Sequence, residues 1–140
     1  MKGLPGLIQL NQWKVDEQRR KVTELEILSE RLADEVTQLQ NDIEREGRNS
    51  GESLEDSQAF SAFLTRTMAQ RAKLKGSIVD LQGQISAAKD DLADAYRELK
   101  SYEVAQAKRD SRETRKQELR DRVKMDEIGL NIFRRNSRVA

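Results

Sequence analysis

Two long heptad runs, separated by a short segment rich in glycine and serine, dominate this sequence. In both runs apolar residues recur at alternating spacings of three and four, which predicts two helices packed as a coiled coil. The first seam is Leu4, Ile8, Val15, Val22, Leu25, Leu32, Val36, Leu39 and Ile43, with Asn11, Gln18 and Ser29 as polar interruptions. The second is Phe60, Leu64, Leu74, Ile78, Leu81, Ile85, Ala88, Leu92, Ala95, Leu99 and Tyr102, with Thr67 and Arg71 as exceptions.

The two seams pair in one register if the chain folds back on itself. The expected layers are Ile43 with Phe60, Leu39 with Leu64, Leu25 with Ile78, Val22 with Leu81, Ile8 with Ala95, and Leu4 with Leu99. In this register the last layer of the first helix is at Leu4. The chain after about Tyr102 therefore continues as a helix that has no partner helix within the chain. The predicted fold class is all-α, an antiparallel two-helix coiled-coil hairpin with a long C-terminal helical overhang.

The amino-acid composition also restricts the kinds of protein that this chain can be. A chain of 140 residues that is 36% charged and 4% aromatic, with one proline, lacks the material for a large globular core but suits long helices. The formal net charge of +1 argues against an overall field that recruits nucleic acid or anionic membrane. The apolar run at the N-terminus is too short for a signal peptide or a membrane span. We therefore expect a cytoplasmic, soluble protein that binds no nucleic acid and does not insert into a membrane.

A few residues predict the helix limits. Pro5 is tolerated in a first helical turn, Gly47 is a natural stop, and Ser53 followed by Asp56 resembles a capping box. The predicted limits are helix one over about 5–46, a turn over 47–52, helix two over about 54–135 and, within it, a segment over 103–135 unpaired within the chain, all in a single coiled-coil domain spanning 1–140.

Residues that carry chemistry are scarce. The chain has no histidine and no cysteine, which removes the usual general base, the usual nucleophile and most zinc sites. Its many carboxylates lie where any solvated helix surface has them, and no glycine-rich phosphate loop occurs. We expect no enzymatic activity, no catalytic residues, no cofactor and no metal.

Binding surfaces are the better candidates, and the first lies near the hairpin tip. More aromatic and apolar side chains gather there than a two-stranded seam needs: Phe60, Phe63, Leu64 and Met68. In the expected register the first helix covers Phe60 and Leu64 but leaves Phe63 and Met68 uncovered. The tip is therefore a candidate interaction site.

A second candidate is Trp13, which falls off the seam on the outer face of the first helix, as do Leu10 and Ile27. Either Trp13 packs along the flank of the coiled coil or it is an exposed anchor for a partner.

The overhang is the third candidate. Four basic residues share one helix face: Arg109, Arg112, Lys116 and Arg120. One interpretation is a solvated helix held by ion pairs between residues four apart. The other is docking into another protein, because the helix finishes in apolar residues that nothing in the chain covers: Val123, Met125, Ile128, Ile132 and Phe133.

Several segments resemble one protein family. Lys124-Met125-Asp126-Glu127, followed by a short apolar stretch and Arg134-Arg135, resembles the C-terminal signature of the FliJ family, small coiled-coil proteins of the bacterial flagellar type III export apparatus. Tyr96-Arg97-Glu98-Leu99-Lys100 is similar to that family, as is Gln58-Ala59-Phe60 with Leu64. The resemblance extends over essentially the whole length.

The resemblance implies a coiled coil similar to the stalk of the F1-ATPase gamma subunit. Such a protein docks its terminal end into the hexameric flagellar export ATPase, promotes assembly and activity of the ring, and links it to the membrane export gate. It would be peripheral at the cytoplasmic face of the inner membrane, at the flagellar base. Its ATPase-facing part would be the basic face with Met125, Asp126, Glu127, Ile128 and Phe133.

The resemblance also assigns partners to the tip. Phe60 and Leu64 match an apolar face that family members turn toward the cytoplasmic part of the export gate and toward export chaperones. The first-helix neighbours of this face are often aromatic in the family but are expected to be Leu39 and Ile43 here.

Other classes remain open. Stalk proteins of virulence type III secretion have the same architecture. A structural coiled-coil adaptor that dimerises through longer heptads would require residues 47–52 to straighten, against their two glycines. A basic-zipper protein would need its basic helix before the zipper rather than after a hairpin.

Overall fold

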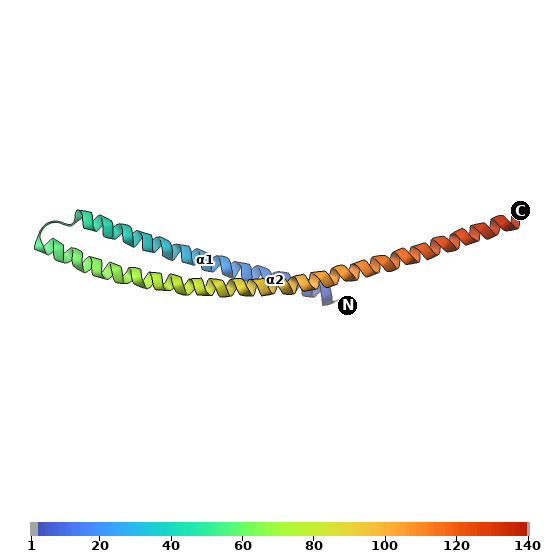
Figure 1. Cartoon of the computed structure of the whole chain (residues 1–140), viewed down its shortest axis with the longest axis horizontal. Helices are drawn as coiled ribbons and strands as arrows, with labels where there is room; N and C mark the ends of the chain where they lie inside the picture. The colour runs from blue at the N-terminus through green and yellow to red at the C-terminus, as the bar shows by residue number, and fades with distance from the viewer. Residues whose placement is uncertain (1–2, 140) are drawn as a thin grey trace. The chain divides into compact units, whose positions relative to one another are not determined.

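The computed structural model describes residues 3–139, and the side chains of residues 3–138. These residues form two α-helices and no strand: α1, Gly3–Asn49, and α2, Leu54–Val139 (Figure 1). The helices contain 47 and 86 residues and are joined by the loop 50–53. The all-α fold class, with two long helices in a coiled-coil hairpin, is confirmed.

The helix limits lie close to the expected ones. α1 starts two residues before Pro5, whose missing N–H is not needed in a first turn. It passes through Gly47 and ends at Asn49, where the hydroxyl of Ser50 donates a 3.1 Å hydrogen bond to the carbonyl of Gly47. No described residue has a positive φ, so α1 ends without a left-handed glycine.

The start of α2 has the predicted cap. The backbone N–H of Asp56 donates to the hydroxyl oxygen of Ser53 at 3.0 Å, and Glu55 and Asp56 place negative charge in the first turn, where the helix dipole favours it. A Cβ on Gly51 would overlap the Asp56 carboxylate, so a larger residue at this point of the loop would require the Asp56 side chain to move.

The chain divides by its contacts into two units, residues 13–96 and residues 3–12 with 97–139. In both, every predicted seam residue is buried or half-buried, and the fully buried ones include polar exceptions. In 13–96 the buried residues are Val15, Val22, Thr67, Leu81 and Ala88, and in the other unit they are Asn11 and Leu99. The predicted seam is therefore confirmed.

The register within residues 13–96 differs from the expected one. Gln40 should lie level with Phe63, but its side-chain oxygen accepts a hydrogen bond at 3.3 Å from Arg71, eight positions further along α2. Glu26 pairs with Lys89 at 3.5 Å, twelve positions beyond its expected level. At 1.5 Å per residue these offsets are about 12 and 18 Å, too far for either contact in the expected register.

A shift of one heptad accounts for these contacts. The helices remain antiparallel, and the seam positions of both helices stay in the interface because a heptad pattern repeats every seven residues. The layers within 13–96 then become Val15 with Ala95, Gln18 with Leu92, Val22 with Ala88, Leu25 with Ile85, Ser29 with Leu81, Leu32 with Ile78, Val36 with Leu74, Leu39 with Arg71, and Ile43 with Thr67. The expected layers in this part of the chain are wrong by seven residues.

Charges beside the seam favour the observed register. In the structure the contacts Glu26–Lys89 and Arg19–Tyr96 join residues five positions beyond the level of the observed layers. The same offset in the expected register would join Arg19 to Lys89, two like charges. In the structure Lys89 instead meets Glu26, and the Arg19 guanidinium lies 5.3 Å from the ring centroid of Tyr96 while donating to its hydroxyl. The observed register thus replaces a repulsive contact with an ion pair and a cation–π contact.

The unit formed by residues 3–12 and 97–139 shows the same shift. Leu4 should face Leu99, but it lines a shared surface hollow with Ala105, Lys108, Arg109 and Arg112. Gln106 and Arg109 are half-buried accordingly. Shielding of α2 by α1 therefore continues past Tyr102 to Arg109, and the fully exposed stretch begins at Asp110 instead of residue 103.

Asn11 provides a test of how this seam is stabilised. Its side chain is 2% exposed, and its Nδ2 donates to the carbonyl of Leu7 at 2.7 Å, but its Oδ1 has no hydrogen-bond partner. Because an unpaired buried acceptor costs about 1–3 kcal/mol, Asn11→Leu should raise the free energy of unfolding by about 1–2 kcal/mol in urea titrations. The exposed Asn41→Leu control should change it by less than about 0.5 kcal/mol. Destabilisation by Asn11→Leu would show that the buried amide is satisfied.

Candidate partner-binding surfaces

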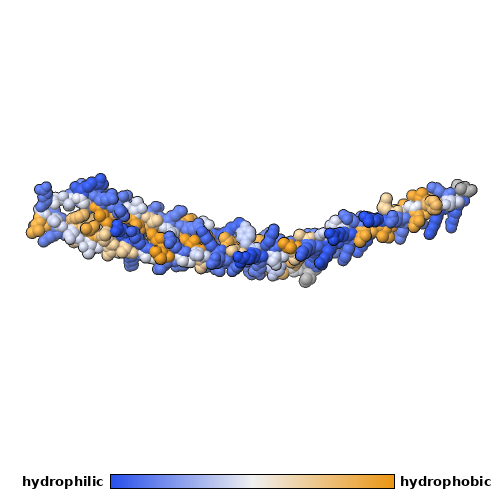
Figure 2. Space-filling view, in the orientation of Figure 1, coloured by the Kyte–Doolittle hydropathy of each residue, from blue (hydrophilic) through white to orange (hydrophobic). Residues whose placement is uncertain are grey.

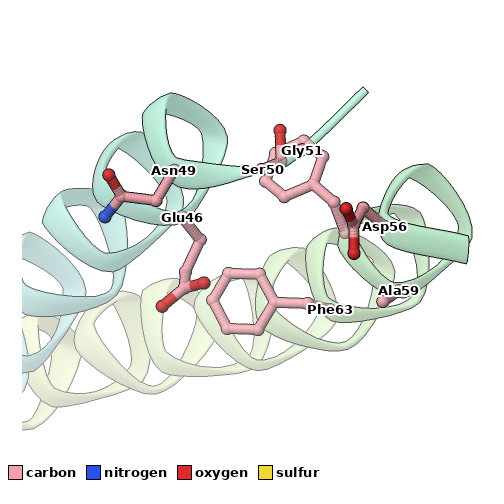
Figure 3. A pocket seen from close by; sticks show the side chains of 8 residues that line it. Glu46, Asn49, Ser50, Gly51, Asp56, Ala59 and Phe63 are labelled. Carbon is pink, nitrogen blue, oxygen red and sulfur yellow. The ribbon is translucent and has the colours of Figure 1, made fainter. Parts of the chain in front are cut away.

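The hairpin tip contains a cavity of about 500 Å³ between the end of α1, the loop and the first turns of α2 (Figure 3). Its lining combines two aromatic rings, two carboxylates and short polar residues. The lining residues are Glu46, Asn49, Ser50, Gly51, Asp56, Ala59, Phe60 and Phe63. The sequence placed aromatic residues here but did not reveal that they border a cavity with two acids.

The heptad shift creates this cavity. Phe60 was expected to pack against Ile43, but the shift pairs Ile43 with Thr67, and the Phe60 ring lies 3.4 Å from the point where a Cβ on Gly47 would be. The first turns of α2 extend past the end of α1 (Figure 1). Phe60 and Phe63 therefore meet backbone and polar residues of the tip in place of apolar residues of the first helix.

The four tip residues named from the sequence do not form one surface. Phe60 and Phe63 lie together, with ring centroids 6.5 Å apart and planes tilted by 31°. Leu64 is half-buried in the seam and does not line the cavity. Met68 is 41% exposed but lies about 140° around α2 from Phe63, at 3.6 residues per turn. The aromatic pair is thus the centre of the tip surface.

The acids of the cavity carry unbalanced charge. Glu46 and Asp56 form no ion pair within the described residues. The nearby Arg45 is engaged with Asp42 at 2.9 Å, and no lysine or arginine lines the cavity. Residues 44–56 contain five carboxylates and two arginines, so the tip is acidic.

The exposed C-terminal part of α2 is the second candidate surface. Every residue from 110 to 138 is exposed, and the hydrophobic colour near this end of α2 is visible in Figure 2. Seven large apolar side chains there are 52–69% exposed: Leu119, Val123, Met125, Ile128, Leu130, Ile132 and Phe133. Five of these residues were expected from the sequence, and Leu119 and Leu130 are additional members of the set.

The spacing of these residues divides them into two faces. Leu119, Val123, Leu130 and Phe133 lie within an arc of about 80°, whereas Met125, Ile128 and Ile132 lie on the opposite side. The first group is called here the apolar stripe. Its heptad spacing continues upstream through Lys116 and Arg112, a signal that could have revealed it from sequence.

The predicted basic face is only partly free. Arg109 is half-buried, and both it and Arg112 line the hollow beside Leu4. Lys116 and Arg120 are exposed, as are Asp126 and Glu127 further along. The exposed basic residues therefore lead directly into the apolar stripe on one side of α2.

Trp13 lies on the outer face of α1 with 58% of its side chain exposed. Packing along the coiled-coil flank therefore leaves most of it uncovered, and its interpretation as a partner anchor stays a prediction. Within residues 3–139 no group of three potential ligands could hold a metal ion. No helix in that range has the length and hydropathy needed to cross a membrane.

The sequence matches one known protein family over nearly its whole length. The family model described as "Flagellar FliJ protein" matches residues 1–138. Comparisons with curated proteins and with solved structures found no match. The family match covers both helices, the tip and nearly all of the exposed C-terminal segment, and it favours the flagellar over the virulence apparatus. The chain therefore belongs to the FliJ family and is a protein of flagellar type III export.

Proposed function

We propose that this chain is a stalk-like coiled coil that binds the hexameric flagellar export ATPase, promotes assembly and activity of its ring, and links it to the export gate and export chaperones. It would work peripherally, at the cytoplasmic face of the inner membrane at the flagellar base. Its contribution would be assembly and coupling, with the chemistry of ATP hydrolysis left to the ATPase.

The observation that carries the ATPase contact is the exposed stretch 110–138. A helix of this length with seven uncovered large apolar side chains has no internal packing to retain them, which favours insertion into a partner. Lys116 and Arg120 lie at the start of the apolar stripe, on either side of Leu119, so the receiving surface should be apolar with an acidic entrance.

The direct test is the ATP hydrolysis rate and oligomeric state of the cognate export ATPase, measured with and without the full chain. Stimulated hydrolysis accompanied by ring formation supports the proposal. An unchanged rate and an unchanged oligomeric state at saturating chain concentration would reject it.

The tip is proposed to contact the export gate or the chaperones. Phe63→Ala should weaken binding to the purified cytoplasmic part of the gate by about tenfold, because it removes one ring of the aromatic pair at the centre of this surface. The melting temperature should fall by no more than a few degrees, since Phe63 is only half-buried and lies outside the seam.

Phe133→Ala is the matched control, because it removes the same side chain at the other end of α2. It should leave binding to the gate unchanged while weakening the ATPase contact. If the two variants bind the gate equally well, Phe63 does not contribute to that interaction.

A further inference from the structure

We infer that the tip cavity receives the side chain of a lysine or arginine from a basic segment of a protein partner. This inference rests on the proposed function, in which the tip is a partner-binding site, and it adds the chemistry of the ligand. The feature behind it is the cavity of about 500 Å³ in which unpaired carboxylates face an aromatic pair.

The geometry provides two kinds of attraction for a cation. In Figure 3 the Glu46 side chain extends from α1 toward the Phe63 ring, and Asp56 lies at the other end of the cavity beside Gly51. A cation between them would be attracted by both carboxylates and, near the ring faces, by the aromatic quadrupole. Phe60 contributes a second ring at a centroid distance of 6.5 Å from Phe63.

Charge disfavours the other ligand classes. An anion would meet Glu46 and Asp56 with no lysine or arginine in the lining to compensate. A purely apolar side chain would leave both carboxylates without a charge partner and would partly displace the water that solvates them. The acidic excess over residues 44–56 would also attract a basic segment at longer range, an effect that weakens with salt.

The cavity favours a side chain on a longer segment over a free small cation. Glu46 and Asp56 are exposed, so the mouth is open and a small ion would remain largely hydrated. Close by, Leu54 begins α2 and is 74% exposed, which offers an apolar contact for a residue next to the bound cation. A basic residue flanked by apolar ones therefore fits the whole tip.

The walls are held in place by local contacts. The Asp56 N–H is bound by Ser53, and the absence of a side chain at Gly51 leaves room for the Asp56 carboxylate. Ser50 is bound to the carbonyl of Gly47. These contacts fix the backbone of the loop and of the first turn of α2 before a partner arrives, which reduces the ordering needed on binding.

The test uses the full chain and a short peptide in which one arginine is flanked by leucines, with NMR chemical shifts to detect weak binding. The control peptide carries citrulline in place of arginine, which keeps the shape and removes the charge. We expect the arginine peptide to shift the amides of residues 46–63 and to bind about tenfold more tightly than the citrulline peptide. Equal affinities for the two peptides would overturn the inference.

Two double variants separate the cavity from the general charge of the tip. Glu46→Gln with Asp56→Asn should reduce arginine-peptide affinity about tenfold, whereas Glu44→Gln with Glu55→Gln, which removes the same charge outside the cavity lining, should change it by less than about twofold. Equal losses in the two variants would contradict a cavity-bound cation.

Measurements with the export gate keep this inference distinct from the proposed function. If Phe63→Ala weakens gate binding while the arginine and citrulline peptides bind alike, the gate contact stands and the cation site is rejected. If the arginine peptide binds through Glu46 and Asp56 but no tip variant alters binding to the gate or to chaperones, the cation site stands and the proposed partners are rejected.

Discussion

Simultaneous replacement of Val123, Leu130 and Phe133 by serine is expected to abolish stimulation of the export ATPase by this chain. These side chains share the apolar stripe and are 55–69% exposed, so nothing within the described chain covers them. A few buried apolar anchors carry most of the binding energy in a typical interface, and losing three should weaken binding by at least about a hundredfold. ATP hydrolysis measured against chain concentration checks this result.

The matched control replaces three exposed apolar residues elsewhere, Ile27, Leu28 and Val79, which are 43–65% exposed. This variant should stimulate the ATPase as the unaltered chain does. Both variants should keep the helical circular dichroism signal, because none of the six residues belongs to the buried seam. Equal stimulation by the two variants would place the ATPase contact away from the apolar stripe.

Cysteines at positions 22 and 88 are expected to form a disulfide within one chain on oxidation, whereas cysteines at 22 and 81 should not. The observed register brings Val22 level with Ala88, and Leu81 lies seven residues, or about 10 Å, from that level. The chain has no cysteine of its own, so the assay has no background. Non-reducing electrophoresis followed by peptide mapping measures the yield.

The comparison between these two pairs is its own control, since Val22, Leu81 and Ala88 are all buried seam residues. A high yield for the 22–81 pair and none for 22–88 would restore the register expected from the heptads. Disulfides formed only between chains would contradict the hairpin itself.

Much of the fold could be predicted because helical periodicity is a local property. The spacing of Leu25, Leu32 and Leu39 already specifies which side of α1 is shielded, and the glycines and Ser53 specify where the chain turns. The polar interruptions were also correctly placed in the seam, since Asn11 and Thr67 are among its most buried residues. These features depend on neighbours a few residues away.

The register could not be read from the apolar pattern, because sliding one helix by seven residues leaves that pattern unchanged. The missing signal lay beside the seam, where the expected register would bring Arg19 next to Lys89. Since Lys89 pairs with Glu26 in the structure, the charge at this position beside the seam favours the observed alternative. Such pairs favour one of the several registers that a heptad pattern allows.

Of the two main candidate surfaces, one could be predicted from the sequence and the other depends on the helix register. The exposed apolar end of α2, including Met125, Ile128 and Phe133, followed from the length of the first helix and needed no structure. The tip cavity did not follow, because it exists only where the shifted register places Phe60 beside the end of α1. The grouping of Phe63 with Glu46, which are distant in sequence, has the same origin.

The sequence by itself determined that this protein is two helices, which side of each is shielded, where the chain reverses, and that a long apolar C-terminal segment has no partner of its own. Only the tertiary structure decided how far the helices slide along one another, and with it the place where α2 becomes fully exposed and the composition of the tip. The physical reason is that apolar burial repeats with every heptad, whereas the charge and aromatic contacts beside the seam, such as Glu26 with Lys89, form in one register alone.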